Sequence, residues 1–217
     1  MKKITKYIPT IILTLLCSCS DYLDIVPDNV TTLDIVFNNR NTAERYLANC
    51  YHFVPDHGSV KRIPGMGAGH ECWFYTTNDS HFDNEVSFYI ARGLQNIDAP
   101  YANYWDGEGG SNLPMFRAVR ECNIFLDYVR DQHKVNDLTD SERKRWIAEV
   151  NVLKAYYHFF LFEHYGPIPI VDKALPVSTD PEGVKVTRMP VDQIVDYMVK
   201  LIDDSYKDLP PVITMEI

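Results

Sequence analysis

Apolar residues recur at helical spacing in four stretches of the chain, which predicts four helices. We expect these helices over residues 42–54, 114–130, 140–165 and 190–206. Three of the stretches follow or contain a residue that favours a helix start: Asn41 before the first, Pro114 in the second and Pro190 in the fourth. The pattern therefore predicts an all-α fold.

The stretch over residues 140–165 is the most informative of the four. Thr139 and Glu142 have the spacing of a capping box at its start, and Gly166 with Pro167 ends it. One face carries Trp146, Val150, Leu153, Tyr157, Phe160 and His164, and the other side carries Ala155, Tyr156, Phe159 and Phe162. A helix that is apolar on all sides has to be covered from several directions. We therefore expect it at the centre of a helical stack, with Trp146, Leu153, Tyr157, Phe160 and Leu161 buried.

A weak internal repeat supports stacked helices. The pattern Leu47-x3-Tyr51-His52-Phe53 returns as Leu153-x3-Tyr157-His158-Phe159. Similarity at long spacing is typical of helix-pair repeats of the tetratricopeptide kind. Between the first two predicted helices, residues 55–112 hold eight of the ten glycines, and we expect a long irregular insertion there that serves binding.

The N-terminus has the features of an export signal. Lysines at positions 2, 3 and 6 precede a short apolar stretch, Ile8 to Leu16, and then Leu16-Cys17-Ser18-Cys19. This order predicts a lipoprotein signal peptide over residues 1–18 with lipid on Cys19, a tether over residues 19–40 and a helical domain over residues 41–217. The alternative is an ordinary secretory signal that leaves Cys19 as a plain thiol, and the nearby Cys17 leaves open which cysteine is modified.

Charge and composition exclude several classes of protein. The chain has 21 basic and 30 acidic residues, so it lacks the basic excess that nucleic-acid binding requires. No paired metal-ligand spacing or nucleophile motif is present, so we expect no metal, no cofactor and no catalytic residues. After Cys19, three cysteines remain at Cys50, Cys72 and Cys122, and any disulfide among them stays open.

Four segments, in order, resemble the SusD/RagB family of outer-membrane nutrient-binding lipoproteins of Bacteroidetes. They are Cys19-Ser20-Asp21-Tyr22-Leu23-Asp24; Ala148-Glu149-Val150-Asn151-Val152-Leu153-Lys154-Ala155-Tyr156-Tyr157 leading to Tyr165-Gly166-Pro167-Ile168-Pro169-Ile170-Val171; Arg188 with Pro190 and Val191; and Leu209-Pro210. Lys154 stands where the family usually has arginine. The resemblance runs along the whole chain but covers only the N-terminal part of the family, whose members are typically more than twice as long, so we expect a truncated form.

The resemblance implies a function and a set of partners. Such proteins are not enzymes, and they capture oligosaccharides or other nutrients at the cell surface. They cover a SusC-like, TonB-dependent transporter in the outer membrane, to which an acyl chain anchors them. Their scaffold is a stack of tetratricopeptide-like helix pairs, and loops that interrupt it form the ligand face.

Candidate ligand-binding residues lie in the insertion. Sugar rings pack an apolar face on aromatic rings while polar neighbours bind the hydroxyls. The aromatic candidates are Trp73, Tyr75, Tyr104 and Trp105, and the polar candidates are Asn78, Asn103 and Asp106. We expect Trp73 or Trp105 to lie partly exposed beside a cleft, and the acidic chain favours a neutral glycan.

Two alternatives remain at this point. In the first, the aromatic residues of the insertion only attach the loop to the helices and bind no ligand. In the second, the chain is a truncated helical-repeat scaffold that binds protein and has no ligand site.

Overall fold

The computed structural model describes residues 32–58, 68–69, 86–98, 100–107, 113–175 and 182–211. Cys19, Trp73, Tyr75, Asn78 and Cys72 lie outside these ranges. The chain divides into two compact units, residues 1–35 and residues 36–217. In the first unit, the described residues 32–35 include most of a single helical turn, α2 (Leu33–Val36).

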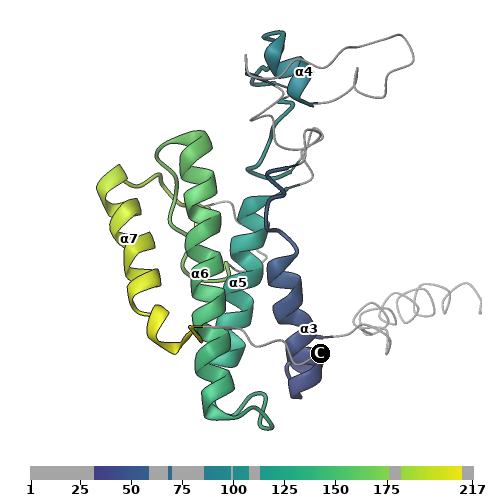
Figure 1. Cartoon of the computed structure of the whole chain (residues 1–217), viewed down its shortest axis with the longest axis vertical. Coiled ribbons are helices and arrows are strands. Elements are labelled where there is room, and N and C mark those ends of the chain that lie inside the picture. Colours follow the sequence, from purple (N-terminus) through teal and green to yellow (C-terminus); the bar gives the residue numbers. More distant parts are fainter. Residues whose placement is uncertain are drawn as a thin grey trace, which may run out of the picture. The chain divides into compact units, whose positions relative to one another are not determined.

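The second unit is built from helices, and its described residues contain no β-strand. The long helices are α3 (Arg40–Tyr51), α5 (Met115–Val129), α6 (Asp140–Tyr165) and α7 (Val191–Asp203). Shorter ones are α4 (Val86–Ala91) and the 3₁₀ turns η2 (Glu182–Val184) and η3 (Tyr206–Asp208). Helix α6 packs against α3, α5 and α7, so it is the central element of the stack (Figure 1).

Helix α6 has the bounds that the sequence predicts. The Thr139 side chain accepts a hydrogen bond from the Glu142 backbone, the Glu142 side chain accepts one from the Thr139 backbone, and Gly166 ends the helix at a φ of 66°. The residues expected in the core are buried: Trp146, Leu153, Tyr157, Phe160 and Leu161. Burial on several faces follows from its neighbours, because α5 and α7 both lie against it.

The other helices differ from their predicted bounds at several ends. Helix α3 starts at Arg40 because the Asn39 side chain, not that of Asn41, caps it by accepting from the Thr42 backbone N–H. It ends at Tyr51, which leaves Val54 outside the helix and exposed. Helix α7 ends at Asp203, and η3 follows it. Helix α4 lies inside the predicted irregular insertion and buries Val86, Ser87 and Phe88.

The helical core also takes in a residue of the predicted tether. Phe37 is fully buried and stacks on Tyr128 with ring centroids 4.5 Å apart, and it meets Tyr46 and Phe125 as well. Its carbonyl accepts a hydrogen bond from the Val135 backbone N–H at 3.1 Å. Residues immediately before α3 are therefore part of the packed structure.

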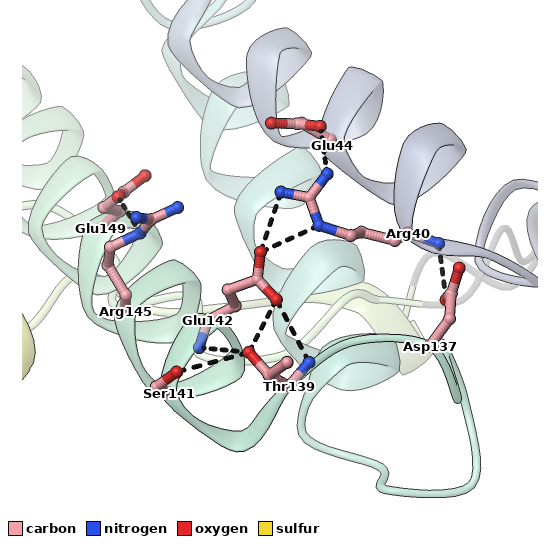
Figure 2. Close-up of polar contacts among 8 residues, drawn as sticks. All are labelled: Arg40, Glu44, Asp137, Thr139, Ser141, Glu142, Arg145 and Glu149. Carbon is pink, nitrogen blue, oxygen red and sulfur yellow. Dashed lines mark hydrogen bonds and ion pairs between the residues drawn. The ribbon is translucent and has the colours of Figure 1, made fainter. Parts of the chain in front are cut away.

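A polar network joins the start of α3 to the start of α6 (Figure 2). The Arg40 guanidinium donates to Glu142 and Glu44 at 2.9 Å each, and the Arg40 backbone N–H donates to Asp137 at 2.7 Å. The same guanidinium lies 5.5 Å from the ring centroid of Trp146. The carboxylate of Glu142 thus serves both the capping box and the contact between helices.

Buried Arg143 holds the connection between α5 and α6. Its guanidinium donates to the carbonyls of Val129, Asp131, Lys134 and Val135 at 2.5 to 3.2 Å. Val129 is the last residue of α5, so this side chain pairs one carbonyl that the helix end leaves without an intrahelical donor, together with three carbonyls of the loop. The loop is thereby fixed to the first turn of α6.

Candidate functional site

A cleft of about 300 Å³ opens between α5 and the segment that connects α6 to α7. Its volume is at the lower end of the range, about 300–1,000 Å³, of small-molecule sites. The lining residues are Trp105, Phe116, Arg120, Pro169, Val171, Lys173, Leu175, Val184 and Val186. They combine an indole, a wall of aliphatic side chains and two basic groups.

Trp105 is partly exposed at this cleft, whereas Trp146 is 1% exposed in the core. Its ring meets the edges of Phe116 and Tyr165, with centroids 4.6 and 5.4 Å apart. The guanidinium carbon of Arg188 lies 5.0 Å from the indole centroid. The indole is therefore held by two aromatic rings and one cation, and part of its surface remains available.

The segment that carries Trp105 is attached to α5 and α6. The backbone N–H groups of Met115 and Phe116 donate to the carbonyls of Tyr104 and Trp105 at 2.9 and 3.4 Å. The Tyr104 backbone N–H donates to the Tyr165 hydroxyl at 2.8 Å. These bonds fix the backbone on both sides of the indole.

Gly107 provides a turn near the start of α5 that other residues would not tolerate. Its φ is 84°, and a Cβ there would lie 2.9 Å from Cδ of Pro114. The turn lies two residues after Trp105, so this glycine helps to set the path of the chain at the cleft.

The other wall of the cleft is anchored to α6 and α7 through Asp172. Lys154, buried on α6, donates to the Asp172 carboxylate at 2.6 Å, and the Tyr197 hydroxyl of α7 donates to it at 2.8 Å. Burial lowers the pKa of Lys154 and the bond to Asp172 only partly offsets this. Burial opposes ionisation of Asp172 as well, but the bonds from Lys154 and Tyr197 outweigh it and leave the pKa of that carboxyl lowered. The pair is therefore an ionic contact that connects the core helix to the cleft wall.

Further hydrogen bonds hold the same connecting segment at its base and along its length. The Met189 backbone N–H donates to the Ile168 carbonyl at 2.9 Å. This bond joins the start of the segment, just after α6, to its end, just before α7. Asn123 of α5 donates to the Val171 carbonyl at 3.0 Å, and Arg120 donates to that of Leu175. The wall is consequently preformed by the scaffold.

The candidate ligand-binding residues that the structure describes do not all lie at the Trp105 cleft. Tyr104 is fully buried, with its ring against Phe160 and His164, so it is a core residue and does not reach a ligand here. Asn103 donates to Asp106 at 2.5 Å. Asp106 lines a different hollow, together with Asn49, His52 and Arg117, and so it does not face the Trp105 cleft.

Sequence reasoning did not select Phe116, Arg120 or Lys173 as binding residues, and it noted Arg188 only as part of the family resemblance, yet all four lie around Trp105. One signal was present, because Phe116 and Arg120 are four residues apart and share a face of α5. Lys173 and Arg188 belong to an irregular segment, and periodicity gives no indication of where their side chains lie.

Among the described residues, no group of three or more His, Cys, Asp or Glu side chains is arranged to hold a metal ion. Within them, no helix combines the length and apolar character that crossing a bilayer requires. Cys50 and Cys122 are buried free thiols.

The chain matches a family model and several solved structures. The model of the SusD-like family described as "Starch-binding associating with outer membrane" matches residues 21–215. A SusD-like protein from Bacteroides fragilis has a TM-score of 0.60 at 17% sequence identity. The match covers 83% of this chain and 31% of that protein. A laminarin-binding SusD-like protein has a TM-score of 0.62 at 16% sequence identity, and the match covers 83% of this chain and 36% of that protein. No curated protein matches the sequence.

These similarities settle the fold class and the family. A SusD-like carbohydrate-binding protein from Bacteroides vulgatus also matches, with a TM-score of 0.54 at 15% identity over 38% of its length and 83% of this chain. The chain spans about a third of the length of these structures. The predicted all-α, tetratricopeptide-like architecture is confirmed, and the chain belongs to the SusD-like family of starch-binding proteins that associate with the outer membrane.

Proposed function

We propose that this protein binds an oligosaccharide in the Trp105 cleft and transfers it, unmodified, to a TonB-dependent transporter of the outer membrane. The single observation that supports this most is a partly exposed indole beside a cleft in a member of a carbohydrate-binding family. Full burial of a large apolar side chain contributes roughly 1.5–3 kcal/mol, and the exposed part of this indole forgoes a share of that unless a ligand covers it.

The lining of the cleft suits a sugar ring. Val171, Leu175, Val184 and Val186 provide apolar surface opposite the aromatic pair of Trp105 and Phe116. The apolar C–H face of a sugar packs on such surfaces, while its hydroxyls require polar groups at the margin. Arg120 and Lys173 line the cleft and carry N–H groups that can donate hydrogen bonds to such hydroxyls.

Calorimetric titration of the whole chain with a panel of oligosaccharides tests the binding step. The panel includes laminarin fragments, because one structural neighbour is a laminarin-binding protein, together with other neutral and acidic oligosaccharides. Trp105→Ala should weaken binding of whichever glycan is recognised by roughly tenfold or more, because stacking is lost.

The matched control for that variant is Tyr206→Ala, which removes an exposed aromatic ring that does not line the cleft. This control should leave affinity unchanged. Unchanged affinity in Trp105→Ala, at equal helical content by circular dichroism, would exclude the cleft as the binding site.

Delivery and anchoring are the remaining parts of the proposal. Lipid on Cys19 would hold the domain at the membrane, where acyl chains contribute about 0.8 kcal/mol per buried methylene. Co-purification of the transporter with the lipidated protein, and its loss in the Cys19→Ala variant, would support this arrangement. If the Cys19→Ala variant still co-purifies with the transporter in detergent, direct contacts between the two proteins, and not the lipid, hold them together.

A protein-binding scaffold is the second candidate function. The observation that favours it is an apolar hollow between α6 and α7, where Phe159, Val195, Val199 and Ile202 are exposed. Asp192, Asp196 and Asp203 lie on the same helix as the last three of these residues, so a suitable occupant is an amphipathic helix with basic flanks. No glycan binding in the panel, with binding of such a helix, would favour this candidate.

A further inference from the structure

The Trp105 cleft is basic although the chain is acidic. Both charged residues in its lining, Arg120 and Lys173, are cations, whereas the whole sequence has 30 acidic and 21 basic residues. A third cation, Arg188, lies over the indole. The distribution of charge at the cleft is thus opposite to that of the protein as a whole.

These three cations are not paired with carboxylates in the described part of the chain. Arg120 donates to the Leu175 carbonyl, and Arg188 donates to the carbonyls of Pro167 and Tyr165 at 2.7 and 3.3 Å. Carbonyl groups orient a guanidinium but do not neutralise it. The acids next to them in sequence have other partners. Asp172, beside Lys173, is bonded to Lys154 and Tyr197, and Glu121, beside Arg120, accepts a hydrogen bond from Tyr46.

Other cations of the same fold show the contrast. Arg40 pairs with Glu44 and Glu142 on two helices, and Lys185, in the same connecting segment as Lys173, pairs with Glu182. Carboxylates therefore neutralise these two cations, whereas none of the described carboxylates is paired with the three cations at the cleft. A surplus of positive charge in a concave, partly apolar site is a favourable place for an anion.

Net charge does not decide the preference of this site. The Debye length at physiological salt is about 8 Å, so charges distributed over the rest of the surface are largely screened from a bound group. The expectation of a neutral glycan rested on the charge of the whole chain. The local charges argue for the opposite choice.

Trp105 and Arg188 together match one kind of ligand. The indole can pack on the apolar face of a sugar ring. The Arg188 guanidinium, 5.0 Å from the ring centroid, uses Nη1 for the two carbonyls and can donate from its other N–H groups to an oxyanion. We propose that the cleft selects an anionic oligosaccharide, one that bears carboxylate or sulfate groups, with Lys173, Arg120 and Arg188 contacting the charged substituent. This inference rests on the proposed carbohydrate-binding function and specifies the class of ligand.

Calorimetric titration of the whole chain tests the inference with three probes of matched length. The probes are a galacturonic acid trisaccharide, a sulfated trisaccharide and a neutral glucose trisaccharide, each at low and at physiological salt. At least one acidic probe should bind about tenfold or more tighter than the neutral one and lose affinity as salt rises. Whichever acidic probe binds more tightly identifies the charged group as carboxylate or sulfate.

Substitutions locate the effect in the cleft. Lys173→Gln should weaken the acidic probe several-fold and leave the neutral one unchanged, and Lys173→Glu should weaken it further. Lys185→Gln is the matched control in the same segment, because its charge is already paired with Glu182, and it should change nothing. Equal affinity for acidic and neutral probes, insensitive to Lys173→Glu, would overturn the inference while the proposed function stands. Absence of glycan binding altogether would overturn both.

Discussion

Acidification should destabilise this fold through one buried histidine, His158 of α6. Its ring is fully buried, and Nδ1 lies 2.7 Å from the Lys154 carbonyl, to which it donates. That bond places the proton on Nδ1 and leaves Nε2 unprotonated, and Nε2 is buried with no hydrogen-bond partner among the described residues. Protonation of Nε2 would put a charge where no acceptor is available.

The direction and size of the effect follow from the pKa of this histidine. Burial is the main cause that lowers the pKa of His158 from its ordinary value of 6.5 to about 4, and the charge of Lys154 acts in the same direction. The unfolded chain therefore binds a proton between pH 6.5 and 4 that the folded chain does not, so stability falls as pH falls through this window. Between pH 7.5 and pH 5 the loss from this residue is about 2 kcal/mol.

Urea denaturation followed by circular dichroism measures this loss. The free energy of unfolding is compared at pH 7.5 and pH 5 for the parent, for His158→Leu, and for His133→Gln, which changes an exposed histidine in the α5–α6 loop. The parent and His133→Gln should lose about 2 kcal/mol, and His158→Leu should lose much less. An equal loss in all three proteins would refute the assignment of the pH dependence to His158.

Two further predictions concern the core helix and the anchor. Leu153→Ala should cost about 2–5 kcal/mol in urea denaturation, because Leu153 is 7% exposed between packed helices, and an unchanged midpoint would contradict its place in the core. Metabolic labelling with a palmitate analogue should mark the protein, and Cys19→Ala should abolish the label; a label that persists in that variant would show that another residue is acylated.

Local signals account for what the sequence predicted correctly. The bounds of α6 follow from Thr139, Glu142 and Gly166, and each acts through bonds or backbone angles within a few residues. Its buried face follows from periodicity alone. The start of α3 was predicted less well because Asn39 and Asn41 are both competent caps, and Arg40 bonds to Asp137 and Glu142 only once the helices have packed.

The cleft depended on tertiary structure and was predicted only in part. Trp105 was identified because an indole among polar neighbours in a glycine-rich segment is unusual. Its neighbour Tyr104 is equally aromatic and is fully buried, and an irregular segment has no period that could separate the two. Arg120 and Lys173 meet only because α5 and the α6–α7 connection lie together in space.

The hydrogen bond between Met189 and Ile168 has a consequence for how recognition can diversify. It holds together the two ends of the segment over residues 169–188, while Asp172 within the segment pairs with Lys154 and Tyr197, so the segment can vary in sequence as long as Asp172 is kept. Lengthening a pinned loop costs little, only about 0.6 kcal/mol for each doubling. Six of the nine cleft-lining residues belong to this segment, so exchanging it between homologous scaffolds, with Asp172 kept, would test whether the proposed ligand preference moves with it.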